Sequence, residues 1–301
     1  NGATDEGNGI RSSDLTYGRG TGSYAAVIET MGCDRFTTVL HGGFDGLDIT
    51  EAEPFRQSFI VDGASKTNYA YNSLQVAIDT LRDPEVVEYN LASIPGVREN
   101  SLNTSLINMC EDRGDAMAVI DLKGGYVPKY ERTTDITSTG DSNLGDVDTT
   151  VNNLRNNMVI NSSYGAAYYP WVQIRDVNNG QLVWVPPSVA AIGAMSFGQR
   201  SSELWFAPAG FTRGGLSTGA AGLPVVAVRE RLTSKQRDRL YDANINPIAQ
   251  FPAEGIVIFG QKTLQVTPSA LDRINVRRLL IFLKRQISRF AATVLFDQNV
   301  R

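Results

Sequence analysis

Between residues 66 and 122 the hydrophobic positions alternate between helical and extended spacing. Apolar side chains three and four apart predict helices over residues 69–81 and 101–110. Continuous apolar runs predict strands over residues 86–94 and 116–122, and the second run is apolar enough to lie at the centre of a sheet. This helix–strand–helix–strand order predicts a largely parallel sheet between two layers of helices, which is an α/β fold.

The middle of the chain carries a hairpin pattern. Residues 164–185 alternate aromatic and polar positions around Asn178-Asn179-Gly180, which predicts two antiparallel strands and a tight turn. Residues 124–148 are rich in Gly, Thr and Asp and predict an exposed loop, here taken as about 123–148. Further helices are expected over residues 149–158, 189–197 and 235–243, and the last is capped by Thr233-Ser234.

The closing 61 residues hold the most regular pattern. An apolar run between glycines predicts a buried strand at residues 255–264. Residues 271–296 predict one helix of about 26 residues, roughly 39 Å long. Its apolar positions Leu279, Phe282, Leu283, Ile287 and Phe290 suggest a face that packs on the core. Its basic positions form the candidate interface with a partner: Arg273, Arg277, Arg278, Lys284, Arg285 and Arg289.

Two interpretations of these cations stay open. They are either the solvated face of a core helix, or they meet acidic groups on a partner, where rim charges set register and partner choice. In the second interpretation, charge reversal at Arg277 and Arg278 disrupts assembly and leaves the subunit folded.

The first 63 residues differ from the rest. They are glycine-rich with short β-type runs at 24–28 and 35–40 and without a helical pattern. We expect a β-rich, incomplete portion at residues 1–63 and an α/β domain at residues 64–301.

Composition narrows the classes of function. The 301 residues carry a net charge of −4, which gives no overall attraction to nucleic acid or to an anionic membrane. Charged residues interrupt every apolar run before it reaches membrane-spanning length. With only Cys33 and Cys110, the chain cannot build a disulfide framework, and we expect both thiols to be reduced.

A search for catalytic, cofactor and metal sites assigns no residue to any of them. Residues 255–263 resemble a phosphate-binding loop, but β-branched residues lie between the glycines and Gln261 precedes Lys262. Residues 18–22 lack the flanking strand and helix that a nucleotide fingerprint requires. The single histidine, His41, lies beside glycines in an expected turn. Arg113-Gly114-Asp115 matches the cell-adhesion tripeptide, but its position favours a helix cap at Gly114.

Four sequence blocks carry a resemblance to a known family. They are residues 204–210 (LWFAPAG), 240–248 (LYDANINPI), 258–264 (IFGQKTL) and 271–279 (LDRINVRRL), together with weaker matches at 40–46, 94–97 and 113–115. In order and spacing they resemble the tail sheath proteins of contractile bacteriophages over residues 39–296. The resemblance implies a non-enzymatic virion protein, assembled in the host cytoplasm, that polymerises around a tail tube and contracts to drive it through the host envelope.

The resemblance also implies partners. These are other sheath subunits, the tail tube, the baseplate and the tail terminator, without direct contact to nucleic acid or membrane. Terminal arms that add strands to neighbouring subunits are missing from the pattern, so this chain, which ends at Arg301 as a tryptic core would, is expected to be monomeric. The alternatives are a nucleotide-binding α/β enzyme and a nucleic-acid-binding domain that uses the basic closing helix.

Overall fold

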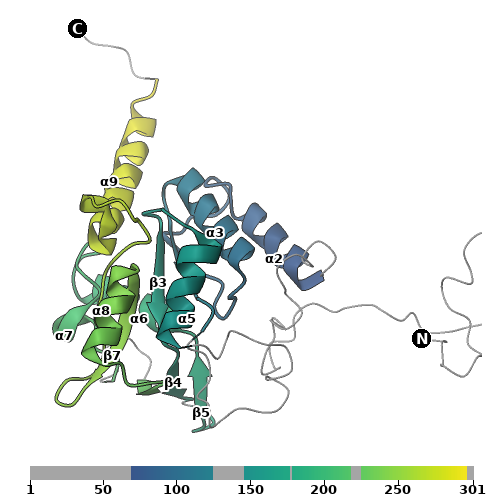
Figure 1. The fold of residues 1–301 in the computed structure, drawn as a ribbon. Helices are drawn as coiled ribbons and strands as arrows, with labels where there is room; N and C mark the ends of the chain where they lie inside the picture. The colour runs from purple at the N-terminus through teal and green to yellow at the C-terminus, as the bar shows by residue number, and fades with distance from the viewer. Residues whose placement is uncertain (1–68, 125–145, 177, 218–224, 297–301) are drawn as a thin grey trace, which may run out of the picture. The chain divides into compact units, whose positions relative to one another are not determined.

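A five-stranded mixed sheet forms the centre of the molecule in the computed structural model, which describes residues 69–124, 146–176, 178–217 and 225–296 (Figure 1). The strand order is β1-β2-β3-β7-β8, with the first four strands parallel and β8 antiparallel to β7. The strands of this sheet are β1 (Leu91–Ala92), β2 (Met117–Ile120), β3 (Gly165–Tyr169), β7 (Ile245–Phe251) and β8 (Gly255–Ile258).

Helices cover both faces of this sheet. The described helices are α2 (Tyr69–Thr80), α3 (Asn100–Arg113), α5 (Val147–Asn152), the π-helix η4 (Asn153–Met158), α6 (Pro187–Ser201), α7 (Gly210–Arg213), α8 (Ser234–Asp242), the 3-10 turn η5 (Ala270–Asp272) and α9 (Ile274–Thr293). Figure 1 shows α3, α5 and α8 on one face. On the other face, side chains of β2 and β3 share a core with α6 and with the start of α9. The predicted α/β fold, with a largely parallel sheet between two layers of helices, is therefore confirmed.

A second sheet of three strands lies in the order β5-β4-β6 and is antiparallel. Its strands are β4 (Val172–Arg175), β5 (Leu182–Val185) and β6 (Val225–Val228). The hairpin predicted over residues 164–185 is therefore only partly right. The hairpin proper is β4–β5, whereas residues 165–169 form β3 of the central sheet. Every residue of β3 is buried, so alternation along the sequence could not separate it from the hairpin.

The strand predicted at residues 86–94 is wrong apart from Leu91–Ala92, which is paired with β2. The reason is a buried guanidinium. Arg113 donates hydrogen bonds to the carbonyl oxygens of Leu81 (2.7 Å) and Val87 (2.9 Å), so this connection is satisfied by a side chain instead of a neighbouring strand. Arg113 also lies 4.2 Å from the Tyr89 ring centroid and pairs with Asp115 at 2.8 Å.

Two other local predictions hold. Gly114 is the left-handed C-cap of α3 with φ +68°, so the tripeptide Arg113-Gly114-Asp115 acts as a helix end. The strand predicted over residues 255–264 holds for its first four residues: Ile256, Val257 and Ile258 are buried in β8, which ends at Ile258, whereas Phe259 is 42% exposed. The predicted helix over residues 271–296 becomes η5 followed by α9. The N-terminal portion, His41, Cys33 and most of the predicted loop at 123–148 lie outside the described residues.

The side-chain amide of Asn246 holds the segment that joins β8 to α9. Asn246, fully buried in β7, donates to the carbonyl oxygens of Ala167 (3.1 Å) and Lys262 (2.8 Å), and its Oδ1 accepts from the Lys262 amide (2.6 Å). The Ile274 amide then donates to the Gln261 carbonyl oxygen at 2.9 Å. The start of α9 is therefore fixed to the central sheet.

Candidate functional site

The first two turns of α9 bury the arginines that the sequence placed on a solvated stripe. Arg277 is 8% exposed, donates to Ser163 Oγ and lies 4.1 Å from the Tyr164 ring centroid. Arg278 is 3% exposed, with Nη2 3.5 Å from Gln199 Oε1. Burial lowers the pKa of both guanidinium groups. A solvated face for these two cations is therefore wrong.

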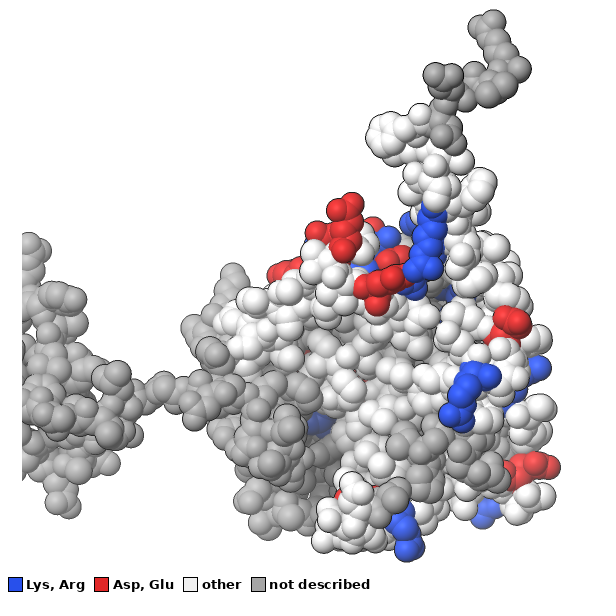
Figure 2. Space-filling model, turned by 180° about the vertical axis from the view of Figure 1, so that it is seen from behind, with Lys and Arg blue, Asp and Glu red and all other residues white. Residues whose placement is uncertain are grey.

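The remaining four cations of α9 also contact their own subunit. Arg285 and Arg289 both pair with the carboxylate of Glu88. Lys284 Nζ lies over the end of α3, so close to Gly114 that a Cβ at this position would clash with it. Arg273 pairs with Asp272 at 3.3 Å and donates to Tyr241 Oη at 2.9 Å. Figure 2 shows acidic and basic side chains gathered at the foot of the projecting helix.

From Leu280 onward, one side of α9 instead presents apolar side chains to solvent. We define the distal seam as the residues Leu280 (41% exposed), Leu283 (41%), Ile287 (65%), Phe290 (70%) and Val294 (43%). Their alternating spacing of three and four residues is that of a helix-packing stripe. Leu283, Ile287 and Phe290 were expected in the core, and this expectation is wrong because α9 extends beyond the body there (Figure 1). Leu295 and Phe296 continue the apolar surface.

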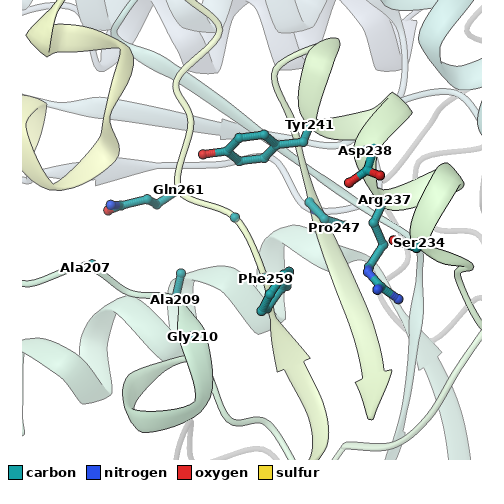
Figure 3. A pocket seen from close by; sticks show the side chains of 11 residues that line it. Ala207, Ala209, Gly210, Ser234, Arg237, Asp238, Tyr241, Pro247, Phe259 and Gln261 are labelled. Carbon is teal, nitrogen blue, oxygen red and sulfur yellow. The ribbon is translucent and has the colours of Figure 1, made fainter.

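A cleft of about 430 Å³ opens near the start of α9 (Figure 3). Its polar wall is α8, which contributes Arg237, Asp238 and Tyr241. Its opposite wall includes Ala207, Ala209 and Gly210, and Pro247, Phe259 and Gln261 complete the lining. Apart from Ser234, Arg237 and Asp238, the lining residues come from three of the four blocks that carry the family resemblance, namely 204–210, 240–248 and 258–264. We call this hollow the α8 cleft.

Exposed aromatic rings adjoin the α8 cleft. The Phe211, Phe251 and Phe259 ring centroids lie 5.2–5.8 Å from one another, and Phe211 and Phe259 are 50% and 42% exposed. Arg237 is directed inward, because it donates to the Leu232 carbonyl oxygen (3.1 Å) and lies 5.2 Å from the Phe251 ring centroid. Asp238 is exposed and forms no ion pair within the described part of the chain. The lining of the cleft therefore carries one residue of each charge, Arg237 and Asp238.

The phosphate-loop pattern at residues 255–263 is excluded by its own hydrogen bonds. The amides that would have to point at an anion already donate within the subunit: Ile256 to Ser217 Oγ, Ile258 to the Gly214 carbonyl oxygen, Phe259 to that of Pro247, Lys262 to Asn246 Oδ1, and Thr263 to the Asp272 carbonyl oxygen. Among the described strands, the order also rises without reversal along the parallel part of the sheet, so these strands form no switch point of the kind at which α/β folds bind nucleotides.

The titratable groups with large pKa shifts are structural. Asp121 is fully buried at the end of β2 and accepts from the amides of Gly96 (2.8 Å) and Ser188 (3.0 Å) and from Ser188 Oγ (2.7 Å). Burial raises its pKa to about 6. Burial also raises the pKa of the free Cys110 thiol to about 12, so this thiol is unreactive at neutral pH. Within the described ranges, no cluster of metal-ligating side chains occurs, and no helix is long and apolar enough to cross a membrane.

Comparison with known proteins confirms the resemblance to tail sheath proteins. No family model matches the chain. The chain is 29% identical over 244 residues to the tail sheath protein of Vibrio phage KVP40, covering 79% of this chain and 36% of that protein. It is 36% identical over 148 residues to the tail sheath protein of Enterobacteria phage T4, covering 48% and 21%. The chain thus spans about a third or less of these relatives.

Two solved structures show the same fold. One is the helical sheath of the anti-feeding prophage in its contracted state, with a TM-score of 0.52, 22% identity, and coverage of 79% of this chain and 55% of that chain. The other is the PVC sheath complex of an extracellular contractile injection system in its contracted state, with a TM-score of 0.50, 20% identity, and coverage of 74% and 53%.

Proposed function

We propose that this chain is part of the structural subunit of a contractile tail sheath, which polymerises around a tail tube and contracts to drive it through the host envelope. The observation that carries the proposal is the sequence likeness to phage tail sheath proteins across 244 residues. The shared fold with sheath chains of two contracted assemblies supports it. The site of action is the virion tail, and the proposed partners are neighbouring sheath subunits, the tube, the baseplate and the terminator.

The mechanism requires no catalytic residue. In a contracting assembly the subunits exchange one packing for another, and the energy comes from contacts that differ between the two arrangements. A subunit suits this role when it moves as a rigid body. The central sheet, covered on both faces and fastened to α9 through Asn246, has that character.

The six predicted interface cations differ in their exposure, and therefore in whether a partner can contact them. Arg273, Lys284 and Arg289 are exposed and stay candidates for contact with acidic groups on the tube or on a neighbouring subunit. Arg285 is half-covered by its pairing with Glu88. Arg277 and Arg278 lie inside the subunit and act on its folding. The alternative of nucleic-acid binding rested on this helix, and the burial of Arg277 and Arg278 removes two of its six cations from that surface.

Immunogold electron microscopy tests the proposal. Antibodies raised against the 301-residue chain are expected to label the tails of the encoding phage along their whole length. After contraction the label is expected on the shortened outer layer and not on the exposed tube. Label confined to the capsid or to the tube would contradict a sheath role.

A further inference from the structure

Lys262 is the lysine of the phosphate-loop pattern, and the proposed function leaves it without a role. Its backbone is held by β7, because the side chain of Asn246 accepts from the Lys262 amide (2.6 Å) and donates to the Lys262 carbonyl oxygen (2.8 Å). Gly260, two residues earlier, allows this close approach, since a Cβ there would lie 2.9 Å from Asn246 Oδ1. The backbone of Lys262 is therefore a fixed point on the central sheet.

From this point the side chain of Lys262 reaches the end of α8. Its Nζ donates to the Tyr241 carbonyl oxygen (2.9 Å), in the last turn of the helix, and lies 4.1 Å from the Tyr241 ring centroid. A cation is favoured at the C-terminus of a helix, where the carbonyl oxygens concentrate negative partial charge. The face of an aromatic ring attracts a cation as well. One ammonium group therefore holds both the backbone and the side chain of Tyr241.

The same residues hold the start of α9. Lys262 forms an antiparallel bridge with Arg273, and the Ile274 amide donates to the Gln261 carbonyl oxygen at 2.9 Å. Arg273 Nη1 donates to Tyr241 Oη at 2.9 Å, so the side chain of Tyr241 contacts both cations. Three of the four blocks that carry the family resemblance thus meet at Lys262, namely 240–248, 258–264 and 271–279.

We propose that Lys262 is a positioning residue that locks α8 and α9 to the central sheet, so that the three move as one body. The inference rests on the proposed function, in which a contracting sheath exchanges one set of subunit contacts for another. It adds that a contact made on the exposed side of α8 is transmitted to α9. Without the ammonium group this direct link is lost, and the end of α8 is expected to open without α9.

Native-state hydrogen exchange of the full 301-residue chain, read by mass spectrometry, tests the proposal. It follows residues 238–244 at the end of α8 and residues 274–281 at the start of α9 as separate peptides. Lys262→Met keeps the aliphatic stem and removes the cation. This variant is expected to speed exchange at the end of α8 about tenfold more than exchange in α9. Loss of a merely structural residue would speed both by the same factor. Lys262→Arg keeps the charge and is expected to retain most of the protection.

Lys235→Met is the matched control, because it removes a cation from the exposed first turn of the same helix. Both peptides of this variant are expected to exchange as in the unmodified chain.

Tyr241→Leu removes the ring and the hydroxyl group but leaves the carbonyl oxygen, and it is expected to give the same difference between the peptides at about threefold. This variant provides the answer if Lys262→Met does not fold. Equal acceleration of the two peptides, or no acceleration of either, would overturn the proposal. The result is independent of the immunogold labelling, so failure of the lock and failure of the sheath role are distinguishable.

Discussion

The two halves of α9 differ in which side chains they bury: charged ones are buried in the inner half, and apolar ones are exposed in the outer half. The inner half buries the guanidinium groups of Arg277 and Arg278, while the outer half exposes Ile287 and Phe290 to solvent. The same helical periodicity runs through both halves, so periodicity does not decide which side chain is buried. What decides it is whether the body of the protein lies beside that turn of the helix. An apolar stripe on a helix therefore indicates packing, but it does not indicate whether the partner belongs to the same chain.

The largest expected effect is on the inner half. Arg278→Glu places a carboxylate in a site that is 3% exposed and lacks a cation partner, so we expect a loss of about 3–5 kcal/mol in the free energy of unfolding. Arg278→Met keeps the volume and removes the desolvation cost, and it is expected to change stability by less than about 1 kcal/mol. Urea unfolding followed by circular dichroism measures both. A stable Arg278→Glu chain would restore the solvated-stripe interpretation.

Alanine substitutions compare the apolar side chains of the two halves. Ile281 is 3% exposed, and Ile281→Ala is expected to cost about 2–4 kcal/mol because it leaves a cavity beside α6. Phe290 is 70% exposed, and Phe290→Ala is expected to change the stability of the monomer by no more than about 0.5 kcal/mol. The same denaturation experiment, at a concentration where the chain is monomeric, provides both values. Equal losses would mean that the outer half packs on its own subunit.

Burial also affects the carboxyl group of Asp121, outside α9, and makes the stability of the fold depend on pH. The pKa of Asp121 is raised to about 6 by burial, so the folded state binds a proton more tightly than the unfolded state. Stability from this group is present below pH 4 and is lost as pH rises through 6, by on the order of 3 kcal/mol. Unfolding free energies measured from pH 4 to 7 are expected to show this decline, and Asp121→Asn is expected to remove it. An identical slope in both chains would contradict the assignment.

A small effect is also expected at the junction of the two halves. Glu88→Gln removes the carboxylate shared by Arg285 and Arg289, all with partly exposed side chains. Ion pairs of this kind contribute about 0–1 kcal/mol and weaken in salt. The loss is therefore expected to stay below about 1 kcal/mol and to vanish in 1 M NaCl. A salt-independent loss of several kcal/mol would show that this junction holds the projecting half in place.

Much of the fold could be predicted from local sequence, and the misses have physical causes. The runs at β2 and β8 are apolar and bounded by turn residues, and Gly114 is the residue type that a left-handed cap requires. The strand expected at 86–94 failed where the side chain of Arg113, from a later helix, donates to the Val87 carbonyl oxygen. Such a long-range contact leaves no mark in the local pattern.

The candidate site was harder to predict than the fold. Six cations on one helix suggested an electrostatic surface, but each contacts its own subunit, and three of the contacted groups (Glu88, Gly114 and Ser163) are far away in the sequence. The α8 cleft joins three separate blocks, around Ala209, Tyr241 and Phe259. Its only signal in the sequence was that each block carries part of the family resemblance. The hollow itself exists only once β7 and β8 bring the blocks together.

The attachment of α9 to the sheet has a mechanical consequence. Its first residue is bonded to the Gln261 carbonyl oxygen, and the neighbouring Lys262 backbone is bonded on both sides to Asn246 inside β7. A force applied at the outer end of the helix is therefore transmitted directly to the central sheet. The helix works as a lever about 30 Å long. Any tilt of the sheet therefore moves the tip of the helix farther than its base.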